Sequence, residues 1–130
     1  MQPQRSLTLS LPVATSINRV DRRLGNKSSI VKIWRKRADA HLWVTRQKLH
    51  SITGKFVADI TWHEDDFGSF DPDNRLKVLL DYLEDRLVIE NDRLCRLLIV
   101  GWGHAPDGCI VTIAPWENWD ENDTYIRRAS

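Results

Sequence analysis

Two short stretches of the chain alternate apolar with polar residues, at residues 7–11 and 55–63. A period of two is the pattern of a half-buried β-strand. Pro12 ends the first stretch, since proline cannot donate a hydrogen bond to a neighbouring strand. The expected inward-facing residues are Leu7, Leu9, Leu11, Phe56, Ala58, Ile60 and Trp62. We therefore predict two strands, of which residues 55–63 form the clearer one.

Two longer segments repeat their apolar residues at helical spacing. The first begins at Ser28 or Ser29, either of which can cap a helix, and runs to about Lys48. Its expected buried side comprises Ile30, Ile33, Trp34, Ala38, His41, Val44 and Thr45. The second begins near Asp71, and its expected core stripe comprises Leu76, Leu79, Leu80, Leu83 and Leu87. We expect His41 to be a packing residue with its polar atoms satisfied rather than a ligand.

Two further strands are predicted after the second helix, at residues 93–100 and 109–114, as partners in a hairpin. The sequence Ala105-Pro106-Asp107-Gly108 between them places Pro and Gly where a type I turn favours them. The predicted fold class is therefore α+β: a small mixed β-sheet with two helices packed on one face, in the order β-α-β-α-β-β. At 130 residues the chain is predicted to be a single domain, 1–130, with a tail from residue 115 that carries Trp116 and Trp119.

Net charge near +1 conceals an uneven distribution of charge. Residues 1–50 hold eleven Lys and Arg against two acids, whereas residues 51–130 hold eight against sixteen. A basic half that neutralises phosphates and an acidic half that binds metal are compatible with a nuclease, although a basic face without a partner gives the same count. No apolar run is long enough to span a membrane and no secretion signal is evident, so we expect a cytoplasmic protein with reduced Cys95 and Cys109.

The charged side of the second helix carries the candidate chemistry. Asp73, Lys77 and Asp81 follow at i, i+4 and i+8, which places them on one stripe, and Asp71 stands just before the helix. Clustered carboxylates suit Mg²⁺, which binds oxygen ligands and phosphate. The alternative is an ordinary N-capping Asp with a helix-face ion pair.

This segment resembles the signature of the RusA family of Holliday junction resolvases. The matching residues are Asp71-Pro72-Asp73-Asn74, Lys77, Asp81 and Asn91-Asp92, and the order of elements is similar from about Ser6 to Ala114, including Leu11-Pro12 and Asn18. The resemblance implies that Asp71, Asp73 and Asp92 bind metal and that Lys77 is the essential lysine. Asn74, Asp81 and Asn91 would support this site.

Two departures from the family pattern affect the site. The first residue of the family's Asp-Asp pair is Asn91 here, although Glu90 lies one residue earlier. Residues 65–70 replace an Arg-rich run that can precede the family's Asp-x-Asp, so substrate contacts there are not carried over.

Residues 13–29 form a basic stretch without periodicity, and so long an unstructured segment is unusual in a compact domain unless it is functional. We interpret it as a loop that follows DNA phosphates; an arm without a role is the alternative. Its expected DNA-binding residues are Asn18, Arg19, Arg22, Arg23 and Lys27.

Together with the resemblance, these features predict an endonuclease, a hydrolase of DNA recombination and repair. It would use Mg²⁺, or Mn²⁺, to cut four-way junction DNA with paired symmetrical nicks. The resemblance implies a homodimer, which would supply two identical sites for the two cuts. We expect strand 55–63, the start of the second helix and Asp92 to converge at one end of the sheet. The alternatives are a nuclease for other branched DNA and a DNA-binding protein whose catalytic site has decayed.

Overall fold

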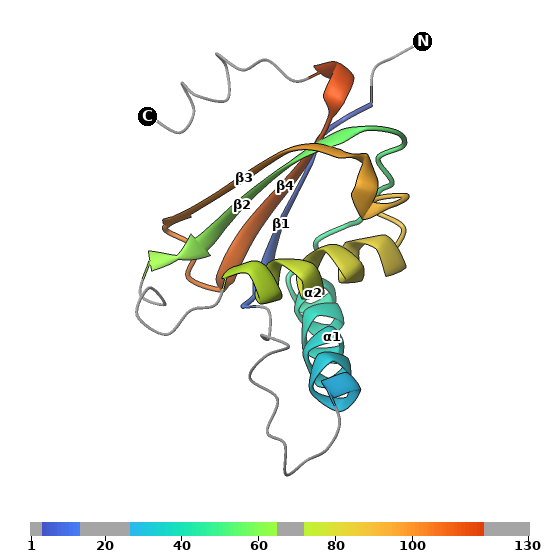
Figure 1. Cartoon of the computed structure of the whole chain (residues 1–130). Coiled ribbons are helices and arrows are strands. Elements are labelled where there is room, and N and C mark those ends of the chain that lie inside the picture. Colours follow the sequence, from blue (N-terminus) through green and yellow to red (C-terminus); the bar gives the residue numbers. More distant parts are fainter. Residues whose placement is uncertain (1–3, 14–26, 65–71, 119–130) are drawn as a thin grey trace.

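The computed structural model describes residues 4–13, 27–64 and 72–118, of which residues 27–29, 72–74 and 118 are described for their backbone alone. Strands and helices follow in the predicted α+β order (Figure 1). They are β1 (Leu7–Pro12), α1 (Lys27–Val44), β2 (Phe56–His63), α2 (Pro72–Asp85), the short 3-10 helix η3 (Asp92–Leu94), β3 (Cys95–Gly103), β4 (Gly108–Pro115) and the short 3-10 helix η4 (Trp116–Asn118).

The four strands form one mixed sheet in the order β1-β4-β2-β3. Strand β4 lies between β1 and β2 and is antiparallel to both, while β3 pairs with β2 in parallel. The predicted hairpin between the third and fourth strands is therefore wrong. The inward-facing apolar residues of β2 and β4 are fully buried, whereas every second residue of β3 is exposed. Strands β2 and β4 therefore occupy the centre of the sheet, and β3 forms an edge.

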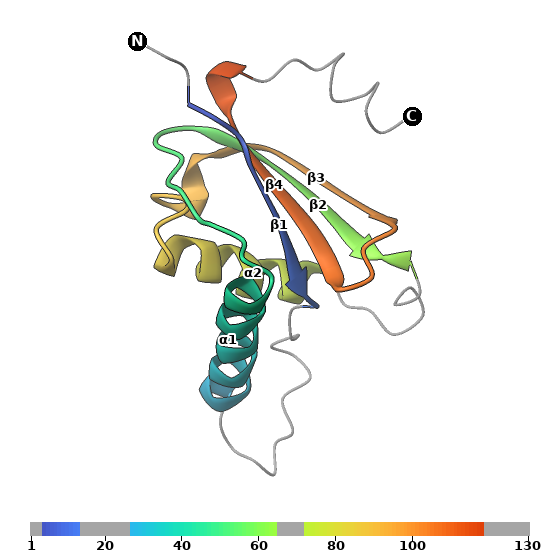
Figure 2. The ribbon, with the colours of Figure 1, turned by 180° about the vertical axis from the view of Figure 1, so that it is seen from behind.

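Both helices pack on the same face of the sheet, as predicted (Figures 1 and 2). A single core cluster lies between the two layers. The fully buried residues of β2 that the pattern predicted, Phe56, Ala58, Ile60 and Trp62, contribute from the sheet. The helices contribute Trp34, Ala38 and Leu42 from α1 and Val78, Leu79, Tyr82 and Leu83 from α2.

The ends of the two helices differ from the prediction. Helix α1 ends at Val44 rather than near Lys48, because Arg46 adopts a left-handed conformation and Gln47 N–H donates back to the Leu42 carbonyl. Helix α2 ends in the same way, with Leu87 left-handed and Val88 N–H bonded to the Leu83 carbonyl. Leu87 therefore lies outside α2 and is 72% exposed, contrary to its predicted place in the core.

The buried side of α1 is rotated from the expected one. Ile33 and Val44 were expected to be buried but are exposed, and Leu42 is buried in their place. The reason is that one stripe of α1 packs against both β1 and α2. Polar residues occupy part of this stripe where it faces α2, and a pattern of apolar residues does not identify such positions as buried.

A polar cluster joins the two helices. The Tyr82 hydroxyl donates to Asp39 Oδ1 over 2.6 Å, and Arg86 donates from Nε to Oδ1 and from Nη2 to Oδ2 of the same carboxylate. Arg35 and Asp85 form an ion pair beside them. These contacts fix α1 against the C-terminal half of α2.

Candidate functional site

Helix α2 carries the motif that the sequence analysis singled out, and it begins at Pro72. Proline is favoured at the first helical position, where its missing N–H has no partner to lose. Asp73 and Asn74 follow within the first turn, with their backbone alone described, while Asp71 lies outside the described residues. The helix start therefore falls where the motif predicted it.

Further along the same helix, Lys77 is exposed and Asp81 is partly buried. They lie one turn apart on the outer side of α2, away from buried Val78, Leu79 and Tyr82. The ammonium group of Lys77 is thus accessible to an anion in solution.

Asp92 and Asn91 lie at the start of η3, and both are exposed. The Asn91 Oδ1 atom accepts a hydrogen bond of 2.9 Å from Arg93 N–H and so caps this short helix. The Asp92 N–H donates to Glu84 Oε1 over 3.1 Å. An amide oxygen caps a helix as well as a carboxylate does, which gives Asn91 a structural role at this departure from the family pattern.

The prediction that Asp92 and the start of α2 converge at one end of the sheet is wrong within one chain. Glu84, which Asp92 contacts, is in the last turn of α2, eleven residues after Asp73. At 1.5 Å per residue this separation is about 16 Å along the helix. The reason is topological: β2 and β3 are parallel, so α2 runs back along the sheet to the end where β3 begins (Figure 1).

The part of the chain that the structure describes contains no group of three His, Cys, Asp or Glu residues placed to hold a metal ion. Asp71 and the side chain of Asp73 fall outside that part. The carboxylate of Asp92 is exposed at the opposite end of α2 from the motif. One chain therefore does not bring Asp92 to the predicted metal ligands at the helix start.

Two histidines lie at the end of the sheet where β2 leads toward α2. The Nδ1 atom of His63 accepts a hydrogen bond of 3.1 Å from Ala105 N–H, and its ring centroid is 6.1 Å from that of His104. A neutral His63 that accepts through Nδ1 carries its proton on Nε2. The sequence analysis did not select this pair, and its signal was weak because the two residues are 41 positions apart.

The outer side of α1 is basic. The exposed cations of this helix and of the segment after it are Lys32, Lys36, Arg37, Arg46 and Lys48. The one acid of α1, Asp39, turns toward α2 and binds Arg86. Trp43 lies among these cations and is 86% exposed. Of the predicted DNA-binding residues, Lys27 begins α1 with only its backbone described, and Asn18, Arg19, Arg22 and Arg23 lie outside the described residues.

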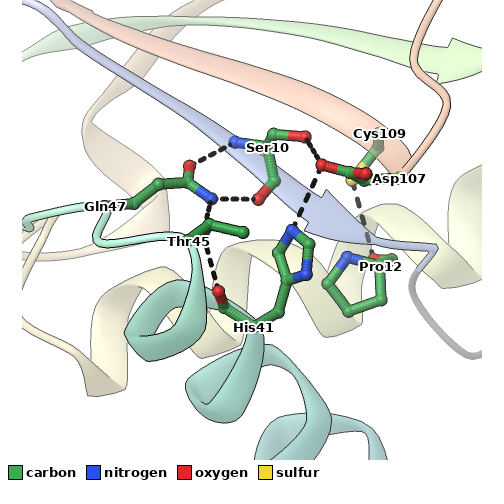
Figure 3. A network of polar contacts seen from close by, with 7 residues as sticks. All are labelled: Ser10, Pro12, His41, Thr45, Gln47, Asp107 and Cys109. Atoms are coloured by element: carbon green, nitrogen blue, oxygen red, sulfur yellow. Dashed lines mark hydrogen bonds and ion pairs between the residues drawn. The ribbon is translucent and has the colours of Figure 1, made fainter.

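A second polar cluster contains serine, aspartate and histidine and so invites comparison with a catalytic triad (Figure 3). Asp107 Oδ2 accepts from the Ser10 hydroxyl at 2.7 Å and contacts His41 Nε2 at 3.2 Å. A triad needs the histidine between serine and carboxylate, whereas here the carboxylate lies in the middle. The hydrogen bond from Ser10 lowers the pKa of Asp107 below its usual value. The cluster therefore joins β1, the end of α1 and the turn before β4, and His41 Nε2 has Asp107 as its partner.

Comparison of the sequence with family models and with curated proteins gives no match in either case. None of the helices within the described residues has the length and apolar character needed to cross a membrane.

Proposed function

We propose that this protein is a metal-dependent endonuclease of the cytoplasm that resolves four-way DNA junctions by paired nicks and acts as a homodimer. The observation that carries the proposal is the spacing of Asp71, Asp73, Asn74 and Lys77 and its similarity to the RusA pattern. In support, α2 begins within this motif and exposes Lys77 on its outer side.

The basic side of α1 supports an interaction with DNA. Three of its exposed cations lie on α1, whose one acid is engaged with Arg86, and two follow that helix, so this side is rich in positive charge. Lys and Arg that neutralise phosphates provide much of the affinity for DNA, and an exposed indole such as Trp43 can stack on an unpaired base. A junction offers both phosphates and unstacked bases at its branch point.

Lys77 is the residue to which we assign stabilisation of the reacting phosphate. Its side chain is exposed and lies on the motif-bearing helix, so its ammonium can approach the negative charge that grows as the phosphodiester is attacked. Asp81, one turn further along α2, would limit the positions available to that ammonium.

The metal would be held between two chains. Because Asp92 contacts Glu84, which lies about 16 Å along α2 from Asp73, we assign the metal to Asp71 and Asp73 of one subunit and Asp92 of the partner subunit. A divalent cation bound by carboxylates lowers the pKa of a bound water and offsets charge on the phosphate. A two-fold dimer would form two such sites, as two symmetrical cuts require.

The first experiment measures binding and cutting of a synthetic mobile four-way junction, with and without Mg²⁺. We expect paired nicks only with Mg²⁺, and Asp73→Asn should abolish cutting while leaving the gel shift unchanged. Asp85→Asn on the same helix serves as the matched control and should cut normally. Faster cutting of a flap than of the junction would favour the other branched-DNA nuclease. Binding without any cutting would indicate a decayed site.

Mixing inactive subunits tests whether the site is shared. When Asp73→Asn and Asp92→Asn proteins are refolded together, about half of the dimers contain one chain of each kind. If each site uses both chains, every mixed dimer has one intact site and nicks one strand, which restores about a quarter of the wild-type sites. If each site belongs to one chain, the mixture stays inactive. Recovery of junction cutting without exchange of subunits between the two proteins would contradict the assignment.

A further inference from the structure

The outer side of α1 carries apolar and cationic side chains on one stripe. Six exposed residues lie at the helical spacings i, i+3, i+4, i+7, i+10 and i+11, which places them on the same side of the helix. They are Ile33, Lys36, Arg37, Ala40, Trp43 and Val44, and we call them the outer stripe. Trp43 is 86% exposed, the highest value for a large apolar side chain among the described residues. Helix α1 extends away from the sheet, below α2 (Figures 1 and 2).

The cations of the outer stripe take no part in the ion pairs that hold α1 in the fold. Asp39, the one acid of α1, binds Arg86 of α2 and so directs its charge inward. Within the part of the chain that the structure describes, no ion pair involves Lys36 or Arg37. Among the described residues, therefore, no acid has to be displaced before an anion reaches these two side chains.

The composition of the outer stripe fits single-stranded DNA better than duplex DNA. Lys36 and Arg37 suit phosphates, which both forms of DNA present. Trp43 suits a flat apolar partner, and the faces of bases are available to it only where the bases are unpaired, because in a duplex they stack on their neighbours. Aromatic side chains placed among cations that follow the backbone are typical of surfaces that bind single strands.

The same stripe does not fit a membrane surface. A helix that lies in the membrane interface gathers its apolar side chains on one face and its cations on the other. Here Lys36 and Arg37 lie between Ile33 and Trp43, so burial of the apolar side chains in lipid would also bury two charges. A single strand of DNA accommodates both kinds of side chain, since it presents phosphates and base faces together.

We propose that the outer stripe of α1 is a binding site for single-stranded DNA, with Trp43 stacked on one base and Lys36 and Arg37 on neighbouring phosphates. The stripe extends about 16 Å along the helix from Ile33 to Val44. Binding there needs neither a metal ion nor the motif of α2, so it is an activity separate from cutting. It gives the protein a preference for DNA with unpaired bases over continuous duplex. The inference rests on the proposed function only in taking DNA as the partner.

Fluorescence anisotropy in EDTA measures this activity in the full chain, with a labelled oligothymidine and a blunt DNA duplex as probes. We expect Trp43→Ala to weaken binding of the oligothymidine by about 5- to 100-fold, the loss of one stacked base, and to change duplex binding by less than about 2-fold. Trp43→Phe keeps an aromatic ring and should keep most of the affinity. Trp116→Ala is the matched control: it removes a 42%-exposed indole from η4, and both affinities should stay unchanged.

The salt dependence of the same binding tests the two cations. Each phosphate contact with a single strand contributes about −0.7 to the slope of the logarithm of the binding constant against the logarithm of the salt concentration. Lys36→Gln combined with Arg37→Gln should therefore make this slope shallower by about 1.4. All of these variants change exposed side chains, so their circular dichroism spectra should match the wild type. An unchanged slope would contradict the assignment of these cations to phosphates.

Two further results would overturn the proposal. One is a wild type that does not bind oligothymidine, including a wild type that binds phosphatidylserine vesicles instead; the other is tighter binding of oligouridine than of oligothymidine. Asp73→Asn should bind oligothymidine like the wild type, because its change lies outside α1. A wild type that binds oligothymidine through Trp43 but cuts no junction would refute the proposed function and leave this site standing. Normal junction cutting together with unchanged oligothymidine binding by Trp43→Ala would refute this site alone.

Discussion

Asp39→Ala is the most direct test of how the two helices are held together. The substitution removes the acceptor of the Tyr82 hydroxyl and both acceptors of Arg86. Tyr82 is fully buried, so its hydroxyl would lose its partner in a place that water does not reach, at a cost of about 1–3 kcal/mol. Asp39 and Arg86 are each more than a third exposed, so solvent screens their ion pair, which adds at most about 1 kcal/mol. We expect Asp39→Ala to lower the free energy of unfolding by about 2–3 kcal/mol.

Urea denaturation monitored by circular dichroism measures this loss, and a double-mutant cycle isolates its main part. Asp39→Ala should cost about 1 kcal/mol less in a Tyr82→Phe background, because no hydroxyl is then left without an acceptor. The hydrogen bonds from Arg86 hold the pKa of Asp39 below its usual value, so the stabilisation is complete above the unfolded-state pKa and is lost as pH falls through the folded-state pKa. A loss under 0.5 kcal/mol, or costs that simply add, would refute this account of the cluster.

Three further predictions concern the motif and the helix ends. Lys77→Ala should reduce the rate of junction cutting by at least about 10²- to 10³-fold while leaving the gel shift unchanged, and a smaller loss would exclude the electrostatic role. Mg²⁺ should raise the melting temperature of the wild type more than that of Asp73→Asn, since clustered carboxylates repel one another until a cation binds; equal shifts would count against a shared site. Leu87→Gly should stabilise the protein by about 0.5–1 kcal/mol in urea denaturation, because Leu87 has a φ of +63°.

The features of this fold that depend on local pattern were predictable from sequence. Strand β2 and the start of α2 were predicted from an alternation and from the motif that opens at Asp71, and both lie where those signals place them. The order of elements and the packing of both helices on one face were also predicted. Strand β2 and the start of α2 are set within ten or so residues, the range over which periodicity acts.

Features that depend on contacts between distant residues were not predictable. Strand β4 lies between β1 and β2. Which strand takes the centre of the sheet depends on how all four strands pair, and the sequence of one segment does not determine this. The separation of Asp92 from the start of α2 follows from the parallel pairing of β2 with β3, and the sequence analysis had paired β3 with β4 instead. A correct pairing would have placed Asp92 at the far end of α2 at once, because a helix between parallel strands must run back along the sheet.

Cys109 provides a prediction at alkaline pH that tests the burial of the central strand. Burial raises the pKa of its thiol to about 12, whereas the thiol of the unfolded chain ionises at its ordinary pKa near 8.5. Above that pH the folded state holds a proton that the unfolded state has released, so stability falls as pH rises. Between pH 7 and pH 10 the wild type should lose about 2 kcal/mol more than Cys109→Ala in urea denaturation. Equal losses of stability in the two proteins would mean that water reaches this thiol. The core between β4 and the helices would then be more accessible to solvent than the structure shows.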